Sequence, residues 1–253
     1  MLARSRGMAH HRLQERQAMV FSHSPDIWTQ CPELVPGVLF ARGISTRASV
    51  GAQVARFSAT AAARLNGGSE SALPEIQAWR RVFAKMGLQP TKYRCASEAL
   101  LRRLRKENAL PRLHPLVDLC NAISAAFAIP VAVFDLSKVV GDMEVRHATG
   151  SESYQTFSGQ LEHPEPQEVI YADQGGNAHA RRWTNRQSSL SGVSAGTHTV
   201  MIVAEALHES AYEDMRTLLA ALMEEIAIAW PAAASKARLL TRASPRFDYT
   251  PEK

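Results

Sequence analysis

An aspartate and an asparagine interrupt the apolar stretch HPLVDLCNAIS, residues 114–124, at positions that could do chemistry. On a helix His114, Asp118 and Asn121 lie at i, i+4 and i+7, so they share one face. An asparagine amide both donates and accepts, so it can hold a substrate amide, a hydroxyl or a water. Alanines surround this strip, whereas an exposed face usually carries Lys or Glu, which favours contact with another element or a ligand. A strip that simply faces water is the alternative.

Glu205 is a second polar residue within an apolar stretch, and this stretch is predicted to form a strand. Its neighbours between residues 199 and 206 are mostly apolar. A carboxylate there either lies at an exposed strand end or is buried and paired, because an unpaired buried carboxylate is costly. The second alternative would indicate a binding site.

A basic stretch runs from Lys92 to Lys106. It contains six basic residues and one acidic residue, an excess that equals the net charge of +5 of the whole chain. Such a local face can attract phosphates, although a solvated helix face is an equally good interpretation. The candidate phosphate-binding residues are Lys92, Arg94, Arg102, Arg103 and Arg105.

The sequence lacks the motifs of several other kinds of active or binding site. There is no Ser-His-Asp order or nucleophile elbow, and Asn66-Gly67-Gly68 lacks the strand, lysine and helix of a phosphate loop. The three cysteines are scattered without metal spacing, so we expect no metal, no cofactor and a reducing, cytoplasmic environment. No apolar run is long enough for a membrane span, and neither a membrane nor DNA is an expected partner.

The elements that must position these residues can be read from periodicity. Helical spacing predicts helices over residues 49–65, 73–86, 96–108, 115–128 and 211–230. Strands are predicted at residues 19–22, 35–44, 130–134, 144–148, 168–171, 178–183 and 198–206. Helices in the first half and strands in the second predict a mixed α/β fold with one sheet face covered.

One folded domain is expected between two tails. Residues 1–18 are basic and lack an apolar pattern, and Pro231 ends the last predicted helix. We therefore expect a basic tail at 1–18, a domain at 19–230 and a second basic tail at 231–253.

With these elements placed, the chain resembles a free-standing B3/B4 domain. This is the module that carries the amino-acid editing site in the β subunit of phenylalanyl-tRNA synthetase. Four stretches carry the resemblance: WRRVF with GLQPTKYR (residues 79–94), SEALLRR (97–103), PLVDLCN leading to FDL (115–136), and VVG with VR and EVI (139–170). The resemblance spans residues 19–230, and it excludes a complete synthetase because no aminoacylation core fits in this length.

The resemblance implies a three-layer sandwich of two sheets and a helical layer. It implies that Asn121 lines the editing pocket and that Glu205 reads the amino-acid side chain, both as catalytic-site residues. Asp118 belongs to the same motif, Cys120 stands where threonine is common, and Ala132 replaces a pocket histidine. These three are the expected substrate-binding positions. The two departures mean that tyrosine specificity does not carry over.

The function that follows is hydrolysis of mischarged aminoacyl-tRNA in trans, with the basic stretch on the tRNA backbone and the aminoacylated 3′ end in the pocket. Two alternatives remain open. One is a tRNA-binding module that has lost the chemistry, which the missing histidine at Ala132 favours. The other is a pocket protein for a free amino acid. The sequence names neither the amino acid, the tRNA nor the oligomeric state.

Overall fold

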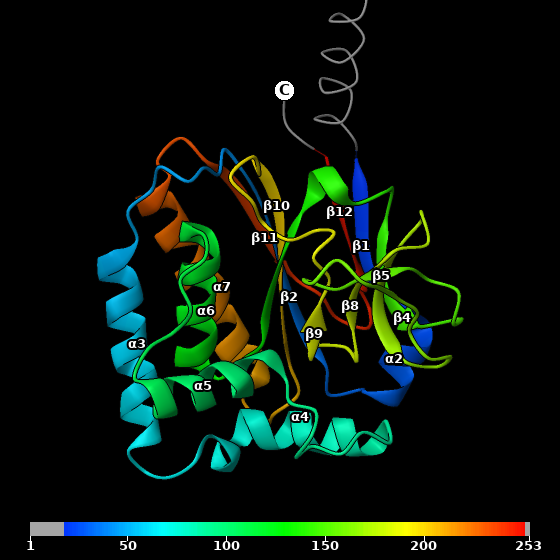
Figure 1. The fold of residues 1–253 in the computed structure, drawn as a ribbon, viewed down its shortest axis with the longest axis horizontal. Helices are drawn as coiled ribbons and strands as arrows, with labels where there is room; N and C mark the ends of the chain where they lie inside the picture. Colours follow the sequence, from blue (N-terminus) through cyan, green and yellow to red (C-terminus); the bar gives the residue numbers. More distant parts are fainter. Residues whose placement is uncertain (1–17, 251–253) are drawn as a thin grey trace, which may run out of the picture.

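The computed structural model describes residues 18–250, which form two stacked β-sheets with helices on the outer face of the smaller sheet (Figure 1). The expectation of a mixed α/β fold in three layers is confirmed. The larger sheet consists, in spatial order, of β12 (Arg246–Tyr249), β1 (Met19–His23), β4 (Met143–His147), β7 (Val169–Asp173), β8 (Ala178–Arg181) and β9 (Arg186–Gln187). The smaller sheet consists of β11 (Ala234–Leu239), β2 (Val35–Arg42), β10 (Thr199–Ala206) and β3 (Val131–Asp135).

The helices divide into two groups. Three of them, α3 (Gly51–Leu65), α6 (Pro115–Phe127) and α7 (Ala211–Ala229), cover the outer face of the smaller sheet. Two others, α4 (Pro74–Lys85) and α5 (Ala96–Glu107), lie across the lower end of the molecule in Figure 1. The remaining short elements are α2 (Pro25–Gln30), η1 (Glu70–Ala72), η2 (Leu136–Lys138), β5 (Tyr154–Gln155) and β6 (Leu161–Glu162).

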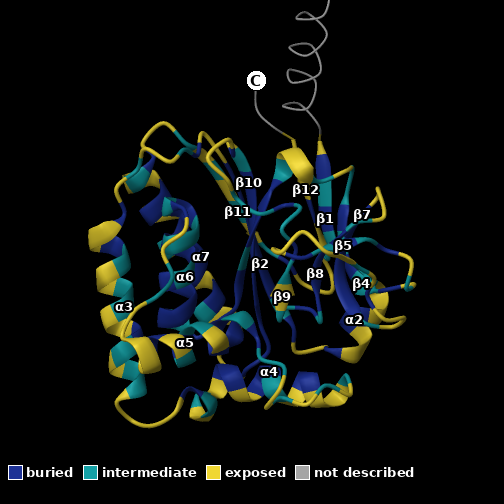
Figure 2. Ribbon diagram, viewed as in Figure 1, coloured by how far each residue is buried: buried dark blue, intermediate teal, exposed yellow. Residues whose placement is uncertain are grey.

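Strand β10 is the centre of the molecule because both of its faces are covered. Successive side chains of a strand point to opposite faces. Val200, Ile202 and Ala204 accordingly join the core beneath the helices. Met201 and Val203 join the core between the two sheets. Figure 2 shows β2 and β10 buried along most of their length, whereas the edge strand β11 alternates between exposed and intermediate residues. The side chain of Glu205 follows the same alternation and points between the sheets.

Helix α6 begins and ends where its sequence specifies. Pro115 occupies the first helical turn, and Nδ1 of His114 accepts a hydrogen bond from the N–H of Leu116 at 3.2 Å. His114 therefore acts as the N-terminal cap, whereas the sequence grouped it with a polar strip. Ala128 has a φ of 55° and ends the helix in a left-handed conformation.

Most sequence-predicted elements are present with ends within two residues, but the C-terminal tail is a correction. Residues 234–239 form β11, which pairs with β2, and residues 246–249 form β12, which pairs with β1. Lys236 and Arg238 are exposed on β11. Edge strands commonly carry such outward charges, and these charges make the sequence of this strand resemble a basic tail. The expected tail at 1–18 lies, apart from Ala18, outside the described residues.

The remaining global expectations concern cysteines and membranes. Cys31, Cys95 and Cys120 are all buried free thiols, as expected for a chain without a disulfide framework. Between residues 18 and 250, no helix combines the length and the apolar character needed to cross a bilayer.

If β12 belongs to the fold, Phe247→Ala should lower the free energy of unfolding by about 3–5 kcal/mol. Phe247 is 2% exposed, and its ring meets that of Phe40 edge to face at 5.1 Å. Urea denaturation followed by circular dichroism measures the change. The matched control is Arg242→Ala, in an exposed position between β11 and β12, which should leave the midpoint unchanged. Equal midpoints for Phe247→Ala and wild type would show that residues 246–249 do not stabilise the fold and behave as a tail.

Candidate functional site

The carboxylate of Glu205 lies at the centre of a buried cluster between the two sheets. The side chain is 1% exposed. Its Oε1 accepts a hydrogen bond from Nε1 of Trp183 at 2.9 Å and lies 2.6 Å from Nε2 of His23. Its Oε2 accepts a hydrogen bond from the hydroxyl of Tyr171. Nε2 of His23 donates to this oxygen in the tautomer that carries the proton on that nitrogen.

All three of these donors belong to the larger sheet or its turns, whereas Glu205 belongs to the smaller sheet. His23 ends β1, Tyr171 lies in β7, and Trp183 follows β8. Burial raises the pKa of Tyr171 well above its ordinary value, and the charge of Glu205 adds to this effect. The hydroxyl therefore keeps its proton and remains a donor. The second of the two alternatives for Glu205, a buried and paired carboxylate, is the correct one.

A pocket opens beside this cluster. Its cavity volume is about 60 Å³, and the pocket continues into open solvent. Ala132 of β3 lines it, directly opposite Val203 of β10 in the strand pairing. Apolar walls with a few polar groups are typical of small-molecule sites. The other lining residues are Ala96, Pro130, Val131, Tyr171, Ala180, Trp183, Thr184, Asn185, Arg186, Gln187 and Glu205.

Residues 184–187 supply the polar groups of this pocket. The hydroxyl of Thr184 is buried and has no hydrogen-bond partner among residues 18–250. Nδ2 of Asn185 donates to the carbonyl of Arg94 at 2.7 Å, and Nε2 of Gln187 donates to the carbonyl of Val133 at 2.6 Å. These two amides are therefore held in place, while the hydroxyl of Thr184 retains unused hydrogen-bonding capacity.

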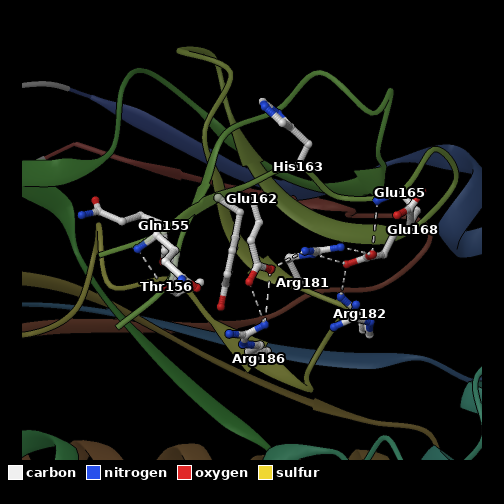
Figure 3. A network of polar contacts seen from close by, with 12 residues as sticks. Gln155, Thr156, Glu162, His163, Glu165, Glu168, Arg181, Arg182 and Arg186 are labelled. Carbon is white, nitrogen blue, oxygen red and sulfur yellow. Dashed lines mark hydrogen bonds and ion pairs between the residues drawn. The ribbon is translucent and has the colours of Figure 1, made fainter. Parts of the chain in front are cut away.

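Ion pairs brace the hairpin that presents these rim residues. Arg181 bonds Glu162 at 2.7 Å and Glu168 at 2.9 Å, and Arg186 lies 3.3 Å from Glu162 (Figure 3). The backbone of Arg182 and Trp183 is left-handed, with φ of 48° and 56°. Strain of this kind persists only where the surroundings hold it, and it is often found at binding sites.

Two of the five expected pocket residues, Glu205 and Ala132, lie together in this pocket. The other three, Asp118, Cys120 and Asn121, lie on α6 and do not line it. Helix α6 covers the outer face of the smaller sheet, whereas Glu205 points to the inner face. The expectation that Asn121 and Glu205 share one pocket is therefore wrong.

The side chains on α6 have structural contacts of their own. Oδ1 of Asp118 accepts a hydrogen bond from the N–H of Leu113 at 2.7 Å, which closes the turn before the helix. Cys120 is buried in the core beneath the helices, and burial raises the pKa of its thiol far above the ordinary value. Asn121 is half-buried.

The tertiary structure brings acidic side chains to much of the basic stretch. Arg102 and Arg105 lie 3.4 and 2.8 Å from the carboxylate of Glu70, whose side chain is 3% exposed. Burial alone would raise the pKa of Glu70, but hydrogen bonds from Arg105 and Arg102 hold it below its ordinary value. The charge of these two arginines is therefore partly neutralised.

The remaining residues of the basic stretch differ in their pairing. Arg94 lies 3.5 Å from Glu98, and Arg103 bonds Glu107 at 2.7 Å on the exposed face of α5. The ammonium of Lys92 is exposed and lies 5.3 Å from the ring centre of Tyr93.

Two cations near the pocket were not predicted from the sequence. The guanidinium of Arg182 stacks on the ring of Tyr93, 4.8 Å from the ring centre. Arg186 lines the pocket, and its side chain is 45% exposed. Arg186 therefore lies at the pocket itself, while Lys92 and Arg182 both lie against the ring of Tyr93. The only sequence signal was the polar, serine-rich stretch WTNRQSSLS at residues 183–191, which is as typical of an ordinary loop as of a binding loop.

A Ser-His-Asp constellation is also present, although the sequence order does not reveal it. Nδ1 of His179 lies 2.8 Å from Oγ of Ser191, and Nε2 lies 3.0 Å from Oδ2 of Asp173. Ser191 and His179 are both 0% exposed. A nucleophile must reach its substrate, so this buried chain ties β7 to β8 and the following loop and does not form a hydrolytic site.

Comparisons with known proteins place the chain in context. The model of the B3/4 domain family matches residues 78–227, more than half of the chain. No curated protein sequence matches it. Among solved structures, the chain is similar to an N-terminal fragment of the phenylalanyl-tRNA synthetase β subunit from Pyrococcus horikoshii, at 14% identity and a TM-score of 0.35. This match covers 49% of the chain and 41% of that fragment, so the chain spans about two fifths of the fragment.

If the hydroxyl of Tyr171 holds Oε2 of Glu205, Tyr171→Phe should lower the free energy of unfolding by about 1–3 kcal/mol, because a buried carboxylate oxygen loses its donor. Urea denaturation at neutral pH measures this, with Tyr212→Phe as the control, since Tyr212 is 52% exposed. Equal losses in both variants would contradict the bond.

The same pair predicts a dependence on pH. The pKa of Tyr171 is raised in the folded state, so its contribution is complete below the unfolded value of about 10 and is lost as the pH rises above it. The stability difference between wild type and Tyr171→Phe should therefore shrink above about pH 10. A difference that stays constant to higher pH would show that the hydroxyl ionises equally in both states.

Proposed function

This chain belongs to the B3/4 domain family, and we propose that it hydrolyses the ester bond of mischarged aminoacyl-tRNA, with the aminoacyl group in the pocket beside Glu205. One observation carries the proposal. Ala132 and Glu205, the positions that the sequence resemblance assigns to the wall and to the side-chain reader of an editing pocket, line one pocket from neighbouring strands. Asn121 does not line it, so the proposal gives Asn121 no catalytic role.

The pocket would promote the reaction by positioning the ester and the attacking water. Water attacks the ester carbonyl, the bond to the ribose oxygen breaks, and the proton of the water goes to that oxygen, which releases a free amino acid and tRNA. The residues that line the pocket include no histidine or cysteine, and both oxygens of Glu205 are already bonded. The hydroxyl of Thr184 and the neighbouring ribose hydroxyl of the tRNA would orient the water, which is catalysis by proximity and preorganised dipoles.

The pocket favours small or apolar aminoacyl groups. Ala132 contributes only a methyl group, and three donors satisfy the carboxylate of Glu205. A substrate hydroxyl or ammonium would have to displace one of these donors, so a charged or phenolic side chain gains little there. Specificity therefore depends on the shape of the pocket.

The tRNA backbone would meet the cations around the pocket. Lys92 and Arg186 are exposed, and Arg182 stacks on Tyr93, against which Lys92 also lies. Phosphate contacts at these positions would direct the 3′ end toward the rim at residues 184–187. In this proposal Arg94, Arg102, Arg103 and Arg105 extend the surface along α5, where acidic neighbours reduce their contribution.

A binding module without chemistry is the second candidate. The alanine at position 132, where the resemblance assigns a histidine, favours it. Incubation of the protein with a panel of mischarged tRNAs separates the candidates. Release of the amino acid supports the hydrolase, a gel shift without turnover supports the module, and the absence of both leaves a protein that binds a free amino acid.

Filling the pocket should stop hydrolysis and leave tRNA binding intact. We expect Ala132→Leu to lower kcat/KM for the best substrate of the panel by about tenfold or more, because the added side chain occupies the aminoacyl position. Ala59→Leu, on the exposed side of α3, is the matched control and should keep wild-type rates. If both variants hydrolyse at the wild-type rate, the aminoacyl group does not enter this pocket.

Removing the rim cations should weaken tRNA binding in a salt-dependent way. For Lys92→Ala with Arg186→Ala, the slope of log Kd against log salt concentration should fall by about one unit for each lost phosphate contact. Gel shifts at several salt concentrations measure the slope. Arg216→Ala removes an exposed arginine from α7 and should have no effect. An unchanged slope in the double variant would place the tRNA on another surface.

A further inference from the structure

The outer edge of β3 lies beside the pocket. This strand ends the smaller sheet and pairs with β10 on one side. The carbonyl of Pro130, just before β3, accepts a hydrogen bond from the N–H of Glu205 on β10 at 3.3 Å. Main-chain groups alternate in direction along a strand, so those of Val131, Val133 and Asp135 point away from β10, toward the outer edge.

Only part of this outer edge is occupied. Nε2 of Gln187 donates to the carbonyl of Val133 at 2.6 Å, and the N–H of Asp135 donates to the carbonyl of Ser191 at 2.9 Å. The N–H and carbonyl of Val131 and the N–H of Val133 make no hydrogen bond within the described part of the chain. Val131 and Val133 are only 8% and 5% exposed. Buried main-chain groups nearly always have a partner, so this edge indicates a bound water or ligand.

The two faces of β3 differ in what a ligand at this edge would meet. The side chains of Val131 and Val133 belong to the core beneath the helices. The side chain of Ala132 packs on the opposite face, against the core between the two sheets, where Glu205 also points. Val131, Ala132 and Gln187 all line the pocket, so the open edge and the face of Ala132 meet there.

We propose that the pocket recognises the main-chain atoms of an α-amino acid unit, which binds the edge of β3 as a one-residue parallel strand beside Ala132. The α-amino group of the ligand donates to the carbonyl of Val131, and the carbonyl oxygen of the ligand accepts from the N–H of Val133. In a parallel pair a residue bonds to the two residues that flank its neighbour, and its side chain shares the face of that neighbour. The ligand side chain therefore lies with Ala132, on the face of Glu205.

The antiparallel arrangement does not fit the pocket. In that arrangement the ligand exchanges both hydrogen bonds with Val131 alone, and its side chain shares the face of the Val131 side chain. That face is filled by the core beneath the helices. The parallel arrangement also directs the carbonyl end of the ligand along β3 toward Gln187 and the exposed Arg186, which both line the pocket.

This inference rests on the proposed function, because it takes the aminoacyl group of the tRNA as the unit that is bound. It adds which atoms of that group are recognised. Every α-amino acid carries the same amino and carbonyl groups, so the edge of β3 accepts any side chain that the pocket can hold. A ligand without the α-amino group leaves the carbonyl of Val131 unpaired, which costs affinity.

Binding of small amides tests the proposal without hydrolysis. The probes are L-alaninamide and L-valinamide, each compared with the same amide lacking the α-amino group, which are propanamide and isovaleramide. NMR titration of the isotope-labelled, full-length protein gives the Kd and the shift of the Val133 amide signal. We expect an L-amino-acid amide to bind and to shift this signal, and the amide without the amino group to bind at least about tenfold more weakly.

A proline at position 133 tests the same contact from the side of the protein. Val133→Pro removes an N–H that points away from β10, and proline is tolerated at such positions of edge strands. We expect the Kd for the amide to rise by about tenfold. Val133→Ala is the matched control, because it also loses the valine side chain but keeps the N–H, and it should bind like the wild type. If circular dichroism shows that Val133→Pro does not fold, the comparison of amides with and without the amino group decides.

The proposal is overturned if neither L-amino-acid amide binds, if the amides without the amino group bind equally well, or if folded Val133→Pro binds like Val133→Ala. The panel of mischarged tRNAs distinguishes this failure from failure of the proposed function. Binding of the L-amino-acid amides by a protein that hydrolyses none of the panel would support this inference and refute the hydrolysis. Hydrolysis by folded Val133→Pro at the wild-type rate would do the opposite.

Discussion

The buried carboxylate of Glu205 is the constraint on which the rest of the structure depends. It comes from the smaller sheet, and its donors Trp183, Tyr171 and His23 come from the larger sheet and its turns. A carboxylate removed from water is tolerated only when its oxygens are paired, so the two sheets must stack in the one arrangement that delivers all three donors. Hydrophobic contact between sheets lacks this directionality, because apolar side chains repack with little preference for angle.

The same pairing shapes the pocket. Trp183 and Tyr171 form part of its wall while they hold Glu205, so that wall is held by hydrogen bonds as well as by packing. The polar groups left for a ligand are therefore at the rim, on the turn from Thr184 to Gln187. The ion pairs of Arg181 with Glu162 and Glu168 fix the hairpin that carries this rim. In the proposed hydrolysis, preorganisation of this kind would take the place of a strong base.

Local signals predicted the elements well. Residues 115–128 show helical spacing with a proline at the start, and residues 198–206 are apolar on both faces, as expected of a buried central strand. These patterns depend on neighbours in the chain, so no tertiary contact was needed to read them. The short helix at residues 25–30 was missed because six residues hold too little periodicity. The strand at 234–239 was missed because its exposed charges resemble a tail, and its pairing with β2 is a long-range contact.

The sequence by itself determined the helices and strands, the mixed α/β class and the resemblance that marked Glu205 and Ala132. Only the tertiary structure decided that these two share a pocket and that Asn121 lies on the other side of the sheet. It also paired Arg102 and Arg105 with Glu70, and it left the outer edge of β3 open beside the pocket. The physical reason is that periodicity specifies which face of an element is buried, whereas the partner on that face depends on how distant elements pack. The charge and the chemistry of a side chain depend on its partners in the fold. The residue spacing within one segment does not specify those partners.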